Sequence, residues 1–389
     1  MRNVRIAAPN SSWSAEAAAV LERALTVIQL VPALEAGGAE RSTMEIARAL
    51  VAAGHRSIVV SGGGRMVDRL IAQGSEHVTL PIGVKSLMTL GQVPRLRALF
   101  RREHVDIVHA RSRMPAWLGW LALRGWTSRP RFVTTVHGLN RPGYYSSIMA
   151  RGERVICVSN TVRDFVLRNY RGTHPTHLVV IPRGVDPDHY PYGYQPDNSW
   201  REWFFAEFAQ LAGAPLLTLP GRGTRLKGHA DAIELVAELK ARGIPTRLLL
   251  LGARQAGRES YVAELEQLAQ ERGVADWIAI SPQRDDARDI FAVSALILQL
   301  SNKPESFGRT VIEALSLCRP VLGYDHGGVG ELLGDLYPAG RVAPGDRERL
   351  AERAAELLRY APAISPLQTY RLADMQASVL ALYRTLMRR

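Results

Sequence analysis

Two glutamates in the second half of the chain, Glu305 and Glu313, lie on either side of a glycine in the segment PESFGRTVIEALSL. If a helix starts near Gly308, the backbone N–H groups of Phe307, Gly308, Arg309 and the residue after them have no partner within the helix. Such a helix start is an anion site at the positive end of the helix dipole. Glu305 then lies in the loop at that end, and Glu313 lies one turn into the helix.

A carboxylate beside an anion site is unfavourable unless hydroxyl groups donate hydrogen bonds to it. A sugar and a ribose supply such hydroxyls, so this segment fits a nucleotide sugar better than a bare phosphate. The alternative is that Glu305 only caps the helix. A further glycine pair, Gly327 and Gly328, follows the next predicted strand, at the edge where open α/β sheets bind their ligands.

A glycine-rich turn, GRGTRLKG, begins at Gly221 and connects a predicted strand to a predicted helix. In such a turn the backbone N–H groups can approach a phosphate, and Arg222 and Lys227 add positive charge. The GxxxxGK[ST] pattern of nucleotide triphosphatases is absent. The alternative is a structural turn with two solvated cations.

In the first half of the chain, Gly37 and Gly38 follow the first predicted strand, where they permit either a tight turn or a close backbone approach to a ligand. His137 ends a strand at the same predicted edge. His109 has a similar position on another strand. For each histidine the alternative is a structural role with its hydrogen bonds satisfied inside the protein.

Short runs rich in Val, Ile and Leu alternate with amphipathic stretches, which predicts α/β units with parallel sheets covered on both faces. We expect two Rossmann-like domains with a boundary near Asp186, where the loop DPDHYPYGYQPDNSW is dense in Pro, Asp, Asn and Gly. The predicted strands are residues 25–32, 56–62, 106–110, 132–138, 154–159 and 177–182 in the first domain, and 216–221, 246–252, 277–282, 295–301 and 320–327 in the second.

The net charge of +12 is distributed unevenly along the 389 residues. Residues 1–185 carry 25 basic and 11 acidic side chains, whereas residues 186–389 carry 24 and 26. The excess therefore belongs to the first half, which predicts an anionic partner for that half, either an acidic membrane or a nucleic acid. The alternative is a solvated basic surface with no specific partner. No run of about 18 apolar residues is present, so a membrane-spanning helix is not expected. The two cysteines lie in apolar runs and fit a reducing compartment.

Two aromatic groups leave alternatives open. Trp117, Trp120 and Trp126 lie among arginines in and after the run MPAWLGWLAL, so they either pack in the core or face a membrane interface. The second group is spaced along one face of a helix, which predicts either core packing or contact with an acceptor or lipid: Trp200, Phe204, Phe208 and Leu211.

Together these motifs carry a resemblance. GRGTRLKG, PESFGRTVIE and GGVGE, with VPALEAGGAER at the first strand, resemble family 4 of the nucleotide-sugar glycosyltransferases, over residues 25–389 and in the family's order. The resemblance implies the GT-B fold, in which two Rossmann-like, doubly wound α/β domains face each other across a cleft. It extends to bacterial enzymes that build lipopolysaccharide core and other surface polysaccharides.

The resemblance also implies roles. Arg222 and Lys227 bind the donor diphosphate, Glu305 holds hydroxyls of the transferred sugar and Glu313 holds the ribose. The backbone of Phe307 and Gly308 faces the sugar and phosphate, with Gly221 and Arg309 in the same donor site. Gly37 and Gly38 close over the diphosphate from the first domain. His137 lies beside the sugar near the reacting carbon, and the catalytic group comprises Lys227, Arg222, Glu305 and His137.

We expect retaining transfer of a hexose, with a UDP-sugar as donor and substrate, no metal and no further cofactor. No Asp-x-Asp lies at a strand end and no His/Cys ligand cluster is present in the sequence. The family usually has Asn-Gly-Val-Asp after the last strand of the first domain, whereas this chain has Arg183 in place of the asparagine. The competing functions are a nucleotide-sugar epimerase of related fold and a basic nucleic-acid-binding protein, although no nucleic-acid motif is found.

The expected organisation is an extension at residues 1–24, an acceptor-binding domain at 25–185, a nucleotide-sugar-binding domain at 186–364 and a helix at 365–389 that crosses back to the first domain. The charge of the first domain predicts an anionic, lipid-linked or lipopolysaccharide acceptor and peripheral contact with acidic membrane. This places the protein in the cytoplasm, at the inner face of the cytoplasmic membrane.

Overall fold

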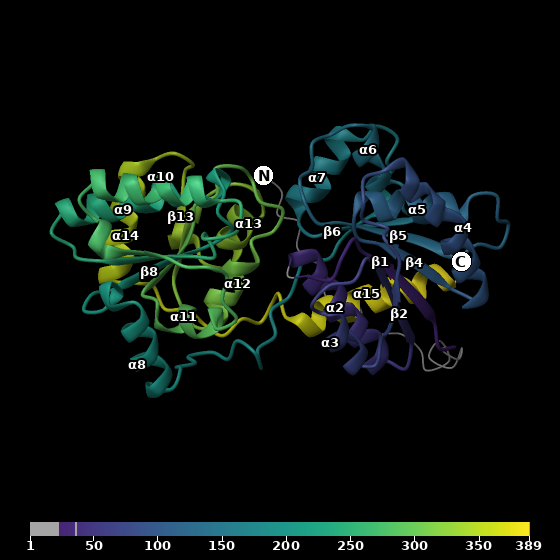
Figure 1. Cartoon of the computed structure of the whole chain (residues 1–389), viewed down its shortest axis with the longest axis horizontal. Helices are drawn as coiled ribbons and strands as arrows, with labels where there is room; N and C mark the ends of the chain where they lie inside the picture. The colour runs from purple at the N-terminus through teal and green to yellow at the C-terminus, as the bar shows by residue number, and fades with distance from the viewer. Residues whose placement is uncertain (1–22, 36, 389) are drawn as a thin grey trace, which may run out of the picture.

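The computed structural model describes residues 23–35 and 37–388. The predicted extension, residues 1–24, lies outside the described residues except for its last two. The chain forms two lobes along its long axis, each a parallel sheet with helices on both faces (Figure 1). The predicted doubly wound α/β fold is therefore confirmed.

The first lobe contains a seven-stranded sheet in the order β3-β2-β1-β4-β5-β6-β7, and every neighbouring pair is parallel. Its central strands are buried on both faces, which explains their continuous Val, Ile and Leu runs. The strands are β1 (Thr26–Leu30), β2 (Arg56–Ser61), β3 (Glu76–Thr79), β4 (Ile107–Ala110), β5 (Arg131–Val136), β6 (Arg154–Cys157) and β7 (Leu178–Val180). The helices are α2 (Gly38–Ala52), α3 (Val67–Ala72), α4 (Gln92–Arg102), α5 (Arg113–Leu123), α6 (Tyr144–Ser147) and α7 (Asn160–Asn169).

The second lobe contains a six-stranded parallel sheet in the order β10-β9-β8-β11-β12-β13. Its strands are β8 (Leu216–Pro220), β9 (Arg247–Leu251), β10 (Ile278–Ile280), β11 (Leu296–Gln299), β12 (Val321–Tyr324) and β13 (Arg341–Val342). Its helices are α8 (Asn198–Glu207), α9 (His229–Ala241), α10 (Glu259–Glu271), α11 (Ala287–Val293), α12 (Arg309–Ser316), α13 (Gly327–Leu336) and α14 (Arg347–Arg359). In each sheet the order of successive strands reverses next to the first strand in sequence, which is β1 in the first lobe and β8 in the second. Connections on either side of this point run in opposite directions and leave a crevice at the carboxyl ends of the strands.

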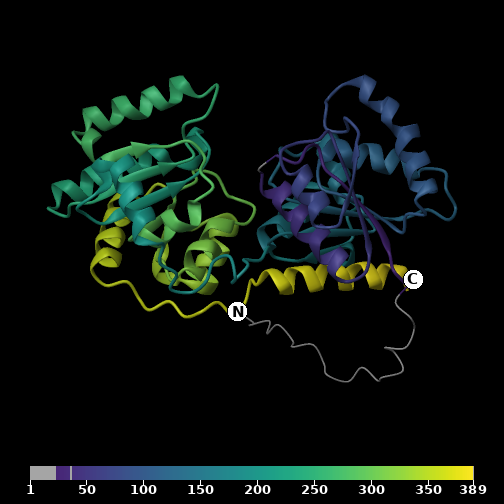
Figure 2. The ribbon, with the colours of Figure 1, turned by 60° about the horizontal axis from the view of Figure 1, so that its bottom comes forward.

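The last helix, α15 (Leu372–Met387), leaves the second lobe through an extended segment and lies along the first lobe (Figure 2). Its apolar face, including Met375 and Val379, packs with Val27 and Ile107 of the first sheet. The predicted helix at 365–389 is wrong at its start, because α15 begins only at Leu372 and residues 365–370 form no regular structure. The chain passes between the lobes twice, once after β7 and once before α15. A parallel bridge between Val185 and Arg371 joins these two connecting segments.

Two strands were not predicted. β3, Glu76–Thr79, is an edge strand with polar alternation, and β13 has only two residues, so neither presents an apolar run.

The aromatic stripe after the linker packs in the core. Phe204 and Leu211 are fully buried, although α8 ends at Glu207 and a 3₁₀ turn carries Leu211.

The tryptophans of the first lobe are half-buried against the core. Trp117 and Trp120 belong to α5 and meet edge to face, with ring centroids 5.7 Å apart. The guanidinium of Arg151 lies 5.4 Å and 5.3 Å from their ring centroids, and that of Arg101 lies 4.8 Å from the ring of Trp126. In the described part of the chain, no helix is both long and apolar enough to cross a bilayer.

Candidate active site

The predicted site residues follow the carboxyl ends of strands in both sheets. Gly37 and Gly38 come after β1 and His137 comes directly after β5, while Gly221 follows β8 and Glu305 follows β11. Hydrogen bonds join the two edges: Ser306 Oγ donates to the His137 carbonyl at 2.7 Å, and Ser159 Oγ donates to the Ser306 carbonyl at 2.6 Å. The structure thus brings residues of both lobes together at one cleft.

Lys227 and Glu305 form an ion pair in the second lobe, with 2.6 Å between Nζ and Oε1. The glycine-rich turn that carries Lys227 ends at Gly228, whose φ of +74° belongs to the left-handed region. A side chain at Gly228 would lie 1.9 Å from the Leu300 carbonyl oxygen, so the turn packs directly on the end of β11. This packing fixes Lys227 beside Glu305 although the two residues are 78 positions apart.

The carboxylate of Glu305 is held in its charged form. Burial alone would raise its pKa, but the charge and hydrogen bond of Lys227 and the hydroxyl of Ser301 lower it below its usual value. His326 contributes a further lowering and is itself fixed by a 2.7 Å hydrogen bond between Nε2 and the Ser301 carbonyl. Glu305 is therefore a hydrogen-bond acceptor at neutral pH, as the holding of sugar hydroxyls requires.

The helix predicted to begin near Gly308 is α12, and Gly308 is its N-cap with a φ of +97°. Its first turn is packed closely by the following helix, since a Cβ at Gly328 would lie 2.4 Å from the Phe307 Cα. The Gly328 N–H donates to the Glu305 carbonyl at 2.8 Å. The second glycine pair thus positions the loop that carries Glu305, and it begins α13 where the sequence predicted the end of a strand.

The ribose-binding candidate Glu313 is buried in α12 and accepts a 2.7 Å hydrogen bond from Arg41 Nη1 of the first lobe. In a second ion pair the second lobe supplies the arginine and the first lobe the glutamate. Arg309 Nη1 and Nη2 donate to the two carboxylate oxygens of Glu45 at 2.5 Å and 2.9 Å. Both pairs join α12 to α2. Helix α2 begins at Gly38 with Gly37 as its N-cap, so its free N–H groups lie at the same junction.

His137 is a neutral hydrogen-bond donor in this structure. Its Nδ1 lies 2.8 Å from Arg183 Nη2, and a guanidinium can only donate, so Nδ1 accepts and the ring proton is on Nε2. Burial, with the positive charge of Arg183, holds the His137 pKa well below its usual value. His137 therefore has no free ring nitrogen to act as a base while this hydrogen bond persists.

Arg222 is exposed and makes no side-chain hydrogen bond or ion pair with any residue that the structure describes. Its neighbour Gly221 lies against the Lys227 side chain, where a Cβ would be 3.1 Å from Cγ and Cδ. Arg222 is thus an unengaged cation at the edge of the site. Within residues 23–35 and 37–388, no three His, Cys, Asp or Glu side chains gather as they would around a metal ion.

His109 is structural. It is fully buried between Tyr383 of α15 and Thr135 of β5, each with its hydroxyl oxygen 2.6 Å from one ring nitrogen. No role was predicted from the sequence for Arg41, Glu45 or Glu331, although Arg41 and Glu331 end the quoted motifs VPALEAGGAER and GGVGE. Glu331 of α13 accepts hydrogen bonds from the backbone N–H groups of Asn160 and Thr161 at the start of α7, which makes a third link between the lobes.

His229 lies beneath the glycine-rich turn and couples folding to pH. Burial lowers its pKa from 6.5 to about 4. Between these two pH values the histidine is protonated in the unfolded chain and neutral in the folded chain. We expect the free energy of unfolding to fall by about 1.4 kcal/mol per pH unit from this residue as pH drops below 6.5. His229→Gln should remove that part of the slope in urea unfolding at pH 7 and 5. An unchanged slope, equal to that of the exposed control His174→Gln, would contradict the assignment.

Comparisons with known proteins decide the family. Residues 36–189 match the family model Glycosyltransferase Family 4, and residues 203–364 match Glycosyl transferases group 1. The chain is a family 4 glycosyltransferase of the GT-B fold. A solved glycosyltransferase from Rickettsia africae superposes with a TM-score of 0.82 and 27% identity, over 94% of this chain and 99% of that one. The predicted resemblance is confirmed.

Other relatives of this glycosyltransferase have more specific names. Anabaena HepE, solved with UDP and glucose, gives a TM-score of 0.74 at 20% identity over 93% of this chain and 100% of that one. A D-inositol 3-phosphate glycosyltransferase of Xylanimonas cellulosilytica is 26% identical over 58% of this chain and 56% of the relative. The chain spans about half the length of the first curated relatives that it matches.

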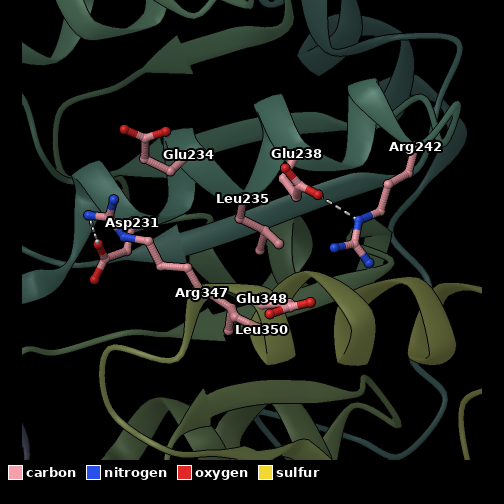
Figure 3. A pocket seen from close by; sticks show the side chains of 8 residues that line it. All are labelled: Asp231, Glu234, Leu235, Glu238, Arg242, Arg347, Glu348 and Leu350. Carbon is pink, nitrogen blue, oxygen red and sulfur yellow. Dashed lines mark hydrogen bonds and ion pairs between the residues drawn. The ribbon is translucent and has the colours of Figure 1, made fainter.

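A groove of about 300 Å³ lies away from this site, on the outer side of the glycosyltransferase's second lobe between α9 and α14 (Figure 3). Two ion pairs lie in its lining: Arg347 contacts Asp231 at 3.1 Å, and Arg242 contacts Glu238 at 2.8 Å. None of the predicted donor-binding residues lines it, so the groove has no part in the site.

Proposed function

We propose that this glycosyltransferase transfers a hexose from a UDP-sugar to an acceptor glycan, with retention of the anomeric configuration and without a metal. The observation that carries the proposal is the convergence of the Lys227–Glu305 pair, the N-terminus of α12 and Glu313 at the cleft. These groups supply, side by side, a cation, free backbone donors and two charged carboxylate acceptors. A sugar diphosphate nucleoside needs all three.

The donor binds with its diphosphate against Lys227, Arg222 and the start of α12, where positive charge is fixed before the reaction begins. Its ribose hydroxyls donate to Glu313 and take the place of Arg41. Hydroxyls of the hexose donate to Glu305. In support of a uridine donor, the structural neighbour HepE was solved with UDP and with UDP-glucose.

Transfer breaks the bond between the anomeric carbon and the diphosphate oxygen, and the electron pair leaves with UDP. The acceptor oxygen forms its bond on the same face, and its proton passes to the departing phosphate oxygen. Lys227, Arg222 and the helix dipole stabilise the charge that develops on this leaving group. Because His137 Nδ1 is occupied by Arg183, the leaving phosphate is the better proton acceptor in this arrangement.

The test is turnover of UDP-glucose, UDP-galactose and UDP-N-acetylglucosamine in EDTA, with UDP release and product anomer followed by NMR. The proposal expects UDP release that depends on an added glycan acceptor and an axial product linkage from an α-linked donor. An inverted product, a strict requirement for divalent metal, or conversion of one UDP-sugar into another without acceptor would contradict it.

We further propose that the acceptor is anionic and lipid-linked and that the first lobe contacts an acidic membrane face. The support is the excess of 25 basic over 11 acidic residues in positions 1–185. The same lobe exposes apolar side chains beside Lys85, including Val84 at 55%, Met88 at 87% and Leu90 at 45%. Two neighbours at 18% and 11% identity, WaaG and WaaB, are named for lipopolysaccharide biosynthesis.

Replacing both Met88 and Leu90 with serine should weaken binding to phosphatidylglycerol vesicles about 10-fold at low salt, because their apolar area is withdrawn from the bilayer while the basic charge stays. Vesicle flotation at 20–300 mM salt measures the effect. Tyr360→Ser, which removes an 82% exposed side chain of the second lobe, is the matched control. Wild-type protein that stays free of anionic vesicles at low salt would refute the membrane proposal.

A further inference from the structure

Two arginines on the first-lobe side of the cleft are buried and have no carboxylate partner among the residues that the structure describes. Arg183 is 7% exposed and donates to the Gly38 carbonyl at 2.6 Å and to His137 Nδ1 at 2.8 Å. Arg111 is 3% exposed, and its hydrogen bonds go to Gln29 Oε1 and Ser42 Oγ. All four acceptors are neutral, which is unusual because a buried cation is normally paired with an anion.

The charge around these arginines is not balanced within the cleft. Three other cations there have carboxylate partners: Arg41 pairs with Glu313, Arg309 with Glu45 and Lys227 with Glu305. The fourth, Arg222, is exposed at the edge of the site. Glu45 is the carboxylate that acts on both Arg183 and Arg111, and it already binds Arg309 through both oxygens. Burial lowers the pKa of Arg183 to about 9 and that of Arg111 to about 10, which reflects the missing anion.

Hydrogen-bond donors are also left over at this point. The guanidinium of Arg183 can donate five hydrogen bonds, and its Nε is buried with no partner among the described residues. His137 carries its proton on Nε2, which is likewise buried and unpaired in the described part of the chain. Such orphaned donors cost free energy unless an acceptor arrives.

The structure is built to admit the guanidinium at this position. A Cβ at Gly38 would lie 2.9 Å from Arg183 Nη1, so glycine makes room for the cation at the start of α2. The family pattern has a neutral asparagine where this chain has Arg183.

We propose that Arg183 and His137 bind a negatively charged group, a carboxylate or a phosphate, on one of the two sugars that meet in the cleft. This group is additional to the donor diphosphate, which Lys227, Arg222 and α12 hold from the second lobe, and the inference rests on the proposed function. Two sources have this chemistry: a uronate as the transferred sugar, and an acidic or phosphorylated sugar as the acceptor. The positive charge of Arg111, which acts electrostatically on Arg183, adds to the attraction for the negatively charged group.

Each source has its own binding assay on the full chain. For the donor, calorimetry compares UDP-glucuronate with UDP-glucose, which differ in the carboxylate at C6. For the acceptor, protein saturated with UDP is titrated with glucose 6-phosphate and with glucose. UDP alone is titrated first, so that failure of the proposed function, no UDP binding at all, is distinguished from failure of the anion subsite.

We expect the charged probe to bind at least about 10-fold more tightly than its neutral counterpart in one of the two assays, the effect of a charge-assisted hydrogen bond. Arg183→Asn should abolish that preference and leave the Kd of UDP within about 3-fold. Arg183→Lys keeps the charge and should keep the fold and part of the preference. Arg168→Asn, an exposed arginine of α7, is the matched control.

Three results would overturn the inference. The first is no preference for the charged probe in either assay. The second is a preference that survives in Arg183→Asn. The third is a loss of UDP affinity of 10-fold or more in Arg183→Asn and Arg183→Lys with both proteins folded, since Arg183 would then serve the diphosphate.

Discussion

Lys227→Ala is expected to lower kcat by about 10³-fold, equivalent to about 4 kcal/mol of transition-state stabilisation. Lys227 is fixed 2.6 Å from Glu305. In the donor site that we propose, it lies where negative charge develops on the leaving diphosphate. The free energy of unfolding should fall by only about 1–2 kcal/mol, because both partners of the ion pair are partly exposed and Ser301 still donates to Glu305. Steady-state kinetics and urea unfolding on the same preparations measure the two losses.

Lys240→Ala is the matched control for this substitution. Lys240 lies in α9 of the same lobe and donates to the Gly273 carbonyl at 2.6 Å, away from the cleft. Its loss should leave kcat within about 2-fold. If Lys227→Ala loses stability and turnover in equal measure, Lys227 is a structural residue and the assignment of the leaving-group site is wrong.

Glu313→Ala is expected to raise the Kd of UDP by about 100-fold, since a buried carboxylate that accepts from two ribose hydroxyls contributes two charge-assisted hydrogen bonds. Glu313→Gln retains an acceptor oxygen and should show an intermediate loss. Calorimetric titration with UDP in EDTA measures both variants. The affinity for a sugar phosphate without a ribose should change much less.

The control for the glutamate series is Glu356→Ala in α14, which removes another helix glutamate that is ion-paired with an arginine. Its UDP affinity should equal that of the wild type. A Glu313→Ala protein that binds UDP normally would show that Glu313 only anchors Arg41 across the cleft.

Local pattern was enough to predict much of this architecture. Of the thirteen strands in the described part of the chain, the apolar runs identified eleven, because buried parallel strands need continuous Val, Ile and Leu. The helix start at Gly308 follows from the strand before it and the apolar spacing after it. The short or polar strands β3 and β13 lack that signal.

Local sequence patterns could not predict the contacts between the lobes. Arg41 and Glu313 are 272 residues apart, and neither periodicity nor a motif connects them before the two sheets are docked. Arg183 was visible only as a departure from a family pattern, and its buried hydrogen bonds to Gly38 and His137 depend on tertiary packing. The start of the last helix was misplaced because Arg371 forms a bridge with Val185, a contact with the first lobe that local sequence does not show, and the helix begins only after it.

The central claim is that the cleft at α12 binds a nucleoside diphosphate sugar, and a thermal-shift panel tests it most directly. The panel comprises UDP, GDP, ADP, CDP and dTDP with EDTA, on the wild type, Lys227→Ala and Glu313→Ala. We predict that UDP raises the Tm of the wild type and that both variants lose most of the shift. No shift with any nucleotide, or an equal shift in all three proteins, would contradict it.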